Sequence, residues 1–358
     1  MSRVLRVICL VFLYGFALTG FLLVSGFLAV KYHLTDSAGK IDFNDRYFQQ
    51  AAKLTGSAKS DSVALGNLSC RLSALAPYLP RVVSGLWEQY AETGDGGLLA
   101  KQLSAQEIYV AGNQVYQSNL KNCQDQAKND QAKLFGLLSG SPVQDGWVAS
   151  EEWSALKEAI VKDKAVIDQV SSETGVLARL IVSMIVGEQL RLFNDNREVF
   201  KQVFQPLKIL GNEVQFSLGV AGIKQETAIK IENNLHDTTS PYYLGQEWES
   251  KLAFKTGDIG EERFERLTDE KNHYYSYLYT ALFLKQVMKQ WASTDNDISG
   301  RPEILATLFN LGFSKSVPKI DPQVGGSEII LNGAHYTFGS LAHQFYYSAE
   351  LGKEFPIK

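Results

Sequence analysis

The sequence predicts a mainly α-helical fold. Along most of the chain, apolar residues recur three or four positions apart, which is the spacing of one helix face. Runs that alternate apolar and polar residues, as strands do, are scarce, and no repeat of fixed period is present. With 358 residues, of which 45% are hydrophobic and 21% charged, the chain has an ordinary globular composition and is long enough for two modest domains.

The segment from Val7 to Val30 predicts a transmembrane helix. It is uncharged throughout and is preceded by Arg3 and Arg6. At about 1.5 Å per residue its helix would be roughly 36 Å long, enough for a hydrocarbon core of about 30 Å. The alternative is a cleaved signal peptide, whose apolar region is usually about 7 to 15 residues long. We therefore expect residues 1–30 to be an uncleaved membrane anchor.

The charges around this anchor predict its orientation. Arg3 and Arg6 favour an N-terminus that stays in the cytoplasm. The chain would then be a single-pass protein of a bacterial inner membrane, with the rest of it in the periplasm. The net charge of -4 gives no electrostatic argument for a nucleic-acid partner.

Two cysteines follow the anchor, Cys70 and Cys123. In an oxidising compartment such as the periplasm a bridge between them would stabilise the fold by about 4 kcal/mol on the chain-entropy model. The alternative is a pair of unbridged, buried thiols. Both alternatives are compatible with the sequence.

The rest of the chain divides at a stretch rich in glycine, serine and proline, Gly136 to Trp147, which we interpret as a linker. Before it, residues 31–147 predict a helical N-terminal region with no dense cluster of titratable groups. After it, residues 148–358 predict a second domain.

Within the second domain the helical patterns have recognisable ends. One very long pattern runs from about Glu261 to Trp291. A compact helix follows, with Pro302 in its first turn and Gly312 just past its last, the usual asymmetry of helix ends. The last helical segment starts at Phe338, and we expect Gly352 to close it.

One glutamate lies where a core residue is expected. Glu188 belongs to a helical pattern that runs from Val176 to Phe193, and it falls on the apolar face of that helix. Burial disfavours the charged form of a carboxyl group, which suits a general acid at neutral pH. The structural alternative is an ion pair across the core, for which Arg179 and Arg301 are available. The residues that share the face with Glu188 are Leu177, Ile181, Met184 and Leu192.

The signatures of several enzyme classes are missing. The sequence contains no His-Glu-x-x-His, no Cys-x-x-Cys, no Gly-x-x-x-x-Gly-Lys and no Gly-x-Ser-x-Gly. The histidines are dispersed, and we interpret each as structural. We therefore expect no metal and no organic cofactor.

Three segments together resemble a known family. Glu188 on its apolar helix is followed by SLGVAGIKQETA, residues 217–228, and later by ATLFNLG, residues 306–312. In this order they resemble the lytic transglycosylases with the lysozyme-like fold, in which a catalytic glutamate ends a helix, a Ser-x-Gly-Leu-Met-Gln-like segment follows, and an Ala-Tyr-Asn-x-Gly helix closes the site. The likeness covers roughly residues 160–350. It implies a lysozyme-like (α+β) domain over residues 148–358.

The resemblance also implies a reaction. Glu188 would act as general acid and then as general base on peptidoglycan, cleaving the glycan strand between MurNAc and GlcNAc. The substrate's own muramic-acid hydroxyl would attack, leaving an anhydro-sugar end. Glycoside hydrolysis commonly uses two carboxylates. The resemblance implies the variant with one.

The substrate contacts follow from the same resemblance. Ser217 and the backbone from Gly219 to Ile223 would hold the acetamido groups of the glycan. Phe309 and Asn310 stand in the closing helix, where Asn310 would contact the substrate or the glutamate.

Three positions depart from the family pattern and support other functions. Gln189 stands where the family often has serine, Gly222 where it has glutamine, and Phe309 where it has tyrosine. These changes suit a lysozyme-like domain without turnover, which binds the cell wall or scaffolds an envelope-spanning complex. A further alternative is a helical envelope adaptor or sensor with no glycan role.

Overall fold

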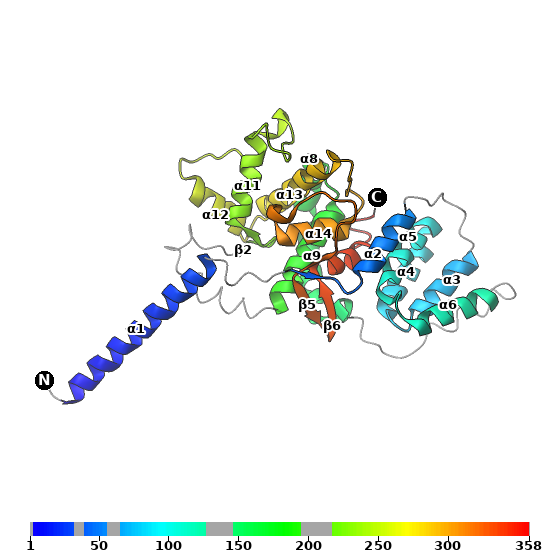
Figure 1. The fold of residues 1–358 in the computed structure, drawn as a ribbon, viewed down its shortest axis with the longest axis horizontal. Helices are drawn as coiled ribbons and strands as arrows, with labels where there is room; N and C mark the ends of the chain where they lie inside the picture. The colour runs from blue at the N-terminus through cyan, green and yellow to red at the C-terminus, as the bar shows by residue number, and fades with distance from the viewer. Residues whose placement is uncertain (1–2, 32–38, 56–64, 127–145, 195–216, 358) are drawn as a thin grey trace.

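Helices make up most of the structure, which confirms the predicted helical class (Figure 1). The computed structural model describes residues 3–31, 39–55, 65–126, 146–194 and 217–357. In the N-terminal part the α-helices are α1 (Arg3–Lys31), α2 (Asp45–Thr55), α3 (Leu65–Leu75), α4 (Pro80–Thr93), α5 (Gly96–Glu107) and α6 (Gln114–Gln126). The later ones are α7 (Glu151–Lys162), α8 (Lys164–Thr174), α9 (Ala178–Asn194), α11 (Gln225–His236), α12 (Ile259–Thr268), α13 (Tyr274–Ala292), α14 (Pro302–Leu311) and α15 (Phe338–Tyr346).

The predicted anchor segment lies in α1. Large apolar side chains described on this helix are exposed, Phe16 by 75% and Phe21 by 68%. No helix among the residues that the structure describes combines the length and the hydropathy needed to cross a membrane.

Three short antiparallel strand pairs accompany the helices. Strands β2 (Ser217–Leu218) and β3 (Ile223–Lys224) form a tight hairpin, with Ser217 opposite Lys224. Strands β5 (Glu328–Leu331) and β6 (Ala334–Thr337) form a second one.

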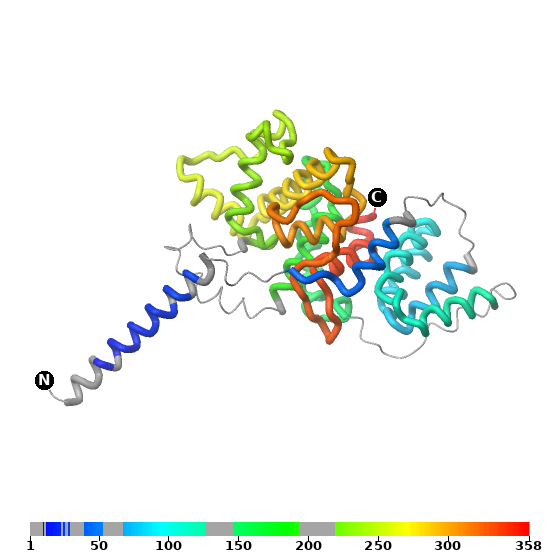
Figure 2. Tube along the Cα trace, viewed as in Figure 1, coloured from blue at the N-terminus to red at the C-terminus, as the bar shows by residue number. Residues whose placement is uncertain are grey.

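The third strand pair joins distant parts of the chain. Strand β1 (Lys40–Ile41) lies against β4 (Gly325–Gly326), with Lys40 opposite Gly326. In Figure 2 the blue trace that follows α1 runs beside the orange-red C-terminal segment. The N-terminal residues are thereby built into the C-terminal half of the fold.

The core is centred on α9, α13, α14 and α15. Helix α14 packs against α15 and α9, and α15 also packs on α9. The apolar residues predicted on one face of α9 are inside it, since Ile181 and Met184 are fully buried. Buried residues of α3, α4 and α5 belong to the same hydrophobic cluster as those of the later helices.

The predicted linker ends in the core. Trp147 is fully buried and its indole Nε1 donates to Gln344 Oε1 at 2.8 Å. Residues 136–145 of the linker lie outside the described residues. Trp147 therefore belongs to the packed fold, and a composition rich in small residues upstream of it did not indicate this.

The long helix predicted from Glu261 to Trp291 is in fact two helices, so this prediction was wrong. Helix α12 ends at Thr268 and α13 begins at Tyr274. Between them the Asp269 carboxylate accepts hydrogen bonds from the backbone N–H groups of Lys271 and Asn272. Such local side-chain bonds compete with helical hydrogen bonds and end the helix.

The helix ends in the C-terminal part were predicted with mixed success. Helix α14 starts at Pro302 and is followed by Gly312 with φ 82°, as expected. Helix α15 ends at Tyr346, well before Gly352, so that prediction was wrong.

An arginine from another helix explains the early end of α15. The buried Arg179 guanidinium donates to the backbone carbonyls of Phe345, Tyr346 and Ser348. It also reaches the carbonyls of Glu350 and Phe355. These bonds satisfy carbonyls that the helix leaves without partners, and burial lowers the pKa of Arg179 to about 10.

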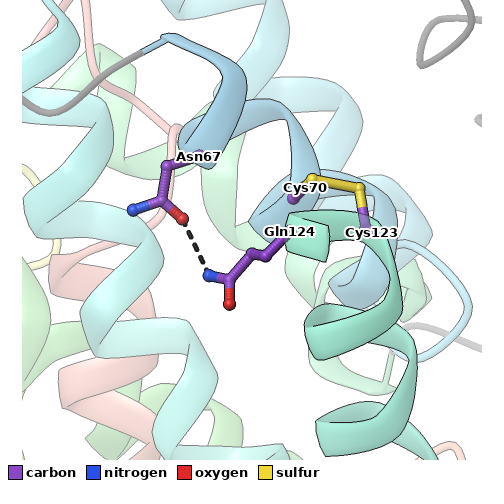
Figure 3. Close-up of a disulfide and its surroundings, with 4 residues drawn as sticks. All are labelled: Asn67, Cys70, Cys123 and Gln124. Atoms are coloured by element: carbon purple, nitrogen blue, oxygen red, sulfur yellow. Dashed lines mark hydrogen bonds between the residues drawn. A yellow bond between two sulfur atoms is a disulfide. The ribbon is translucent and has the colours of Figure 1, made fainter. Parts of the chain in front are cut away.

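Cys70 and Cys123 form a disulfide that joins α3 to α6 (Figure 3). The S–S distance is 2.10 Å and the two residues are 53 positions apart. One turn away, Gln124 Nε2 donates to Asn67 Oδ1 at 2.9 Å. Helices α3 and α6 thus pack against each other and are joined by one disulfide and one side-chain hydrogen bond.

Candidate functional site

The candidate site is at the C-terminal end of α9. Glu188 is 3% exposed, and Arg191 one turn further on is 6% exposed. The Glu188 side chain therefore lies on the buried side of the helix, as the apolar spacing predicts.

Glu188 is ion-paired within its own helix. Arg191 Nη2 lies 2.5 Å from Glu188 Oε1, and Arg191 Nε donates to Oε2 at 3.2 Å. Both carboxylate oxygens are thus met by one guanidinium, which balances the carboxylate charge within the helix.

The arginines proposed as partners across the core lie elsewhere. Arg179 binds the carbonyls that follow α15. Arg301 pairs with Glu303 at the start of α14. The structural alternative of a buried ion pair at Glu188 thus has a partner in the structure, but that partner is three residues away on the same helix.

The β2–β3 hairpin lies directly on the Glu188 carboxylate. Gly222, in the turn of the hairpin, has φ 59°, and a Cβ atom built there would fall 1.9 Å from Glu188 Oε1. The side chain of Gln189, next along α9, donates through Nε2 to the carbonyl of Val220 at 2.5 Å. Two consecutive residues of α9 therefore contact the same turn.

This contact explains one departure from the family pattern. A glutamine at position 222, where the resemblance places one, would have no room beside Glu188. Gly219 is similarly constrained, because its φ is 65° and an added Cβ would fall 1.9 Å from the carbonyl oxygen of Leu267. Only glycine adopts such backbone conformations at little cost.

The other residues predicted to contact substrate are divided between two places. Ser217 and Gly219 are in the hairpin, where Gly219 is exposed, whereas the side chain of Ile223 is 3% exposed and belongs to the core. Only the backbone of Ile223 is thus suited to the role predicted for it. The Ser217 side chain lies outside what the structure describes.

Phe309 and Asn310 lie in the last turn of α14, which packs on α9. The Phe309 ring contacts Phe283 edge-on at 5.4 Å between centroids and Phe338 at 6.2 Å. Asn310 Oδ1 accepts from the backbone N–H of Ser327 at 2.8 Å and from its hydroxyl at 3.1 Å. The described hydrogen bonds of Asn310 therefore hold the start of the β5 segment rather than the glutamate.

Sequence reasoning missed a second buried carboxylate. Glu232 of α11 accepts two hydrogen bonds from Arg263 of α12, each 2.6 Å long, and one from the Tyr279 hydroxyl of α13, also 2.6 Å. Burial and the Glu232 charge raise the pKa of Tyr279, so its phenol stays protonated and donates. No local sequence pattern predicts this cluster, because its three residues are far apart in the sequence.

Histidines and acidic residues do not gather into a metal site. Across the described ranges, no group of three or more His, Cys, Asp or Glu residues is placed to hold an ion. His343 is buried and hydrogen-bonds to Tyr109 through Nδ1 at 2.9 Å, whereas His273 pairs with Asp163 at 2.5 Å. These two histidines tie helices together.

The site thus consists of a buried carboxylate in the C-terminal half of α9, a guanidinium that binds both its oxygens, and a glycine-rich hairpin packed on it. Because Arg191 occupies both oxygens, a bound group reaches the carboxylate only when the Arg191 side chain moves away. Comparison of the chain with protein families, with curated proteins and with solved structures finds no match.

Proposed function

We propose that this protein is a membrane-anchored, lysozyme-like lytic transglycosylase that cleaves peptidoglycan glycan strands, with Glu188 as its general acid and base. The observation that carries the proposal is the packing of the β2–β3 hairpin on the Glu188 carboxylate. A buried glutamate in the C-terminal half of a helix, with a glycine-rich hairpin on it and helix α14 packed against the same helix, agrees in part with the arrangement that the family resemblance implies.

The reaction requires Glu188 to separate from Arg191 and to become protonated. A general acid must carry a proton at the start of the reaction, and a guanidinium that binds both carboxylate oxygens disfavours this state. In the proposed mechanism a bound glycan displaces the Arg191 side chain and the freed carboxylate takes up a proton from solvent. The carboxyl group then gives this proton to the glycosidic oxygen as the glycosidic C–O bond breaks, and the muramic-acid hydroxyl oxygen forms the new bond to the anomeric carbon. The resulting carboxylate takes the proton of the substrate's attacking hydroxyl, so no net proton is consumed.

The backbone of the β2–β3 hairpin would bind the glycan. Gly219 is exposed in the turn and the Gly222 N–H donates to the Gly219 carbonyl at 3.2 Å, which fixes the shape of the turn. Peptide groups in such a turn suit the acetamido groups of a glycan, which both donate and accept hydrogen bonds.

We place the anchor in α1. Its 29 residues carry exposed apolar side chains, and a helix of about 1.5 Å per residue and this length exceeds the roughly 30 Å of a bilayer core. Alkaline extraction of membranes that contain the full chain tests this part: an integral protein stays in the pellet, and release into the supernatant would contradict the anchor.

Digestion of purified sacculi by the full chain tests the reaction. Wild type is expected to release anhydro-muropeptides, and Glu188→Gln is expected to reduce their release at least 100-fold because the acid is lost. Glu265→Gln, an exposed glutamate of α12, is the matched control and should retain full release. A wild-type protein that releases no anhydro-muropeptides would contradict the proposal.

The Glu188–Arg191 ion pair favours a second candidate function, binding to the cell wall without turnover. A carboxylate whose charge is balanced internally has a structural reason to be present and needs no catalytic one. In this case sacculi would retain wild type and Glu188→Gln equally in a pull-down, and neither protein would release soluble product. The same component would then serve as a scaffold of an envelope-spanning complex.

A further inference from the structure

The segments that follow α1 and α14 carry large apolar side chains that are unusually exposed. Phe43 is 89% exposed and Ile320 is 88% exposed, while Ile41 and Val317 are 60% and 64% exposed. We refer to these four side chains as the Phe43 patch. Apolar surface of this kind marks a binding face more often than a free surface.

The two halves of the Phe43 patch are held together by the fold. Besides the β1–β4 pairing, the Asp42 N–H donates to the Val324 carbonyl at 2.8 Å. The Gln49 side chain also donates to the carbonyl of Pro322 at 2.5 Å. These bonds hold residues 40–42 beside residues 322–326, so the two segments that carry the patch are neighbours in the fold.

A pocket of about 380 Å³ opens within the same surface. Its size is within the range of ligand-binding pockets, and its floor is apolar, with Trp291, Ile304 and Leu308 among the lining residues.

The charges at this pocket have one sign. The described lining includes Lys40, Lys315 and Lys319 and no aspartate or glutamate. Lys315 and Lys319 are exposed, and Lys40 is paired with Glu328 outside the pocket. An apolar pocket with a cationic rim suits a molecule that has an aliphatic chain and an anionic head.

The length of the chain between α1 and the patch limits the distance between them. Only seven residues, and so eight Cα–Cα steps, separate Lys31, at the end of α1, from Gly39, at the edge of the pocket. At about 3.5 Å per extended residue they span at most roughly 28 Å. If α1 is anchored as in the proposed function, on which this step rests, the patch cannot leave the vicinity of the bilayer surface.

We propose that the Phe43 patch docks on the bilayer beside the anchor and binds its anionic lipids. Phe43 and Ile320 enter the interfacial layer, the pocket receives a lipid acyl chain, and Lys315 and Lys319 meet the negatively charged headgroup. Exposed aromatic and aliphatic side chains next to lysines are the groups that hold proteins at anionic membrane surfaces. The docking fixes the orientation of the domain relative to the membrane.

Hydrogen exchange of the full chain in lipid nanodiscs tests this inference. Discs of phosphatidylcholine alone are compared with discs that also contain phosphatidylglycerol, and exchange is followed in peptides that cover residues 39–43 and 315–324. We expect exchange in both peptides to be at least fivefold slower in the anionic discs. Phe43→Ser with Ile320→Ser, and separately Lys315→Glu with Lys319→Glu, should abolish this protection.

The control is Val115→Ser with Ile259→Ser, which removes apolar side chains that are 61% and 47% exposed away from the patch; it should leave the protection unchanged. Equal exchange in the two kinds of disc, or equal protection in wild type and both patch variants, would overturn the inference and leave the anchor intact. A chain that washes off the discs in high salt would overturn the anchor and the docking together. Neither result would alter the release of anhydro-muropeptides, which tests the glycan reaction separately.

Discussion

Two buried glutamates of this protein have their negative charge balanced by different kinds of partner. Glu188 is bound by Arg191 of its own helix, at 2.5 and 3.2 Å. Glu232 is bound by Arg263 and Tyr279, which come from two other helices, at 2.6 Å each. The first pair needs only one helix to form, whereas the second joins α11, α12 and α13.

We infer from this difference that the fold requires the Glu232 carboxylate, whereas the Glu188 carboxylate is available for a functional role. When the Glu232 cluster opens, three helices lose a shared hydrogen-bonded contact in a buried place. The Glu188–Arg191 pair forms within α9, so its opening breaks no ion pair between helices. A glutamate that can change partner without unfolding the protein is the one suited to proton transfer.

The largest effect is expected at Glu232. Glu232→Gln leaves the Arg263 guanidinium buried without its counter-charge and should lower the free energy of unfolding by about 3–5 kcal/mol. Denaturant unfolding of the full chain in detergent measures it, with Glu265→Gln as the exposed control on α12. A loss as small as that of the control would mean that the cluster does not join the three helices.

The next largest effect is the pH dependence of stability that is expected from the buried side chain of His343. Burial lowers the pKa of His343 to about 4, against the partly opposing effects of the Glu303 and Asp42 carboxylates and with a smaller lowering by Arg301. The unfolded chain takes up this proton near pH 6.5, whereas the folded protein takes it up only near pH 4. Stability should therefore fall as the pH is lowered through this window, by about 3 kcal/mol in total.

Unfolding curves between pH 7.5 and 4 measure this loss in wild type and in His343→Gln. The slope of stability against pH should be shallower in the variant, since it has no imidazole to protonate on unfolding. His236→Gln, at an exposed position, is the control and should keep the wild-type slope. Parallel curves for wild type and His343→Gln would contradict the assignment.

The packing of Gly222 on Glu188 predicts a smaller effect. Gly222→Ala should cost about 2–3 kcal/mol, of which about 1–2 come from the left-handed backbone and the rest from the collision with the carboxylate. In a Glu188→Ala background the collision disappears, so the same substitution should cost only the backbone part. Equal costs in both backgrounds would show that the hairpin does not rest on the glutamate.

The smallest effect is expected at the Glu188–Arg191 pair itself. Arg191 lies in the last turn of α9, where a positive charge is stabilised by the free carbonyls of the helix end. Glu188→Gln leaves the buried Arg191 without its counter-charge, as Glu232→Gln leaves Arg263, but these carbonyls offset part of the loss. It should therefore cost only about 1–2 kcal/mol of stability, although it removes the proposed activity. A double-mutant cycle with Arg191→Gln measures the coupling, and a value as large as the loss at Glu232 would remove the distinction between the two glutamates.

Local features of the fold were predictable from the sequence, and contacts between distant segments were not. Pro302 and Gly312 mark the ends of α14 because each acts on its own backbone. The break before α13 was missed although Asp269 is a residue that caps and turns favour, since the helical pattern from Glu261 to Trp291 was interpreted as continuous. The end of α15 depends on Arg179, 166 or more residues earlier, and no local pattern contains that information.

The same division holds at the candidate site. The apolar spacing around Glu188 predicted its burial, and Arg191 at the i+3 position was readable as a partner, but the search for one was directed across the core. Gly222 lies against the carboxylate because the hairpin packs on α9. The sequence pattern indicates only a glycine-rich loop at this place and does not contain that contact.

The pairing of β1 with β4 has a mechanical consequence. Any tension on the N-terminal segment reaches the folded part first at Lys40 and Ile41, where one short strand pair and the bonds of Asp42 and Asp45 hold the chain to Val324. The load then passes to the segment that follows α14 and not to the disulfide-linked helices α3 and α6. A force on α1 that exceeds this attachment would separate β1 from β4 before it reaches the core around Glu188, so this strand pair is expected to yield first.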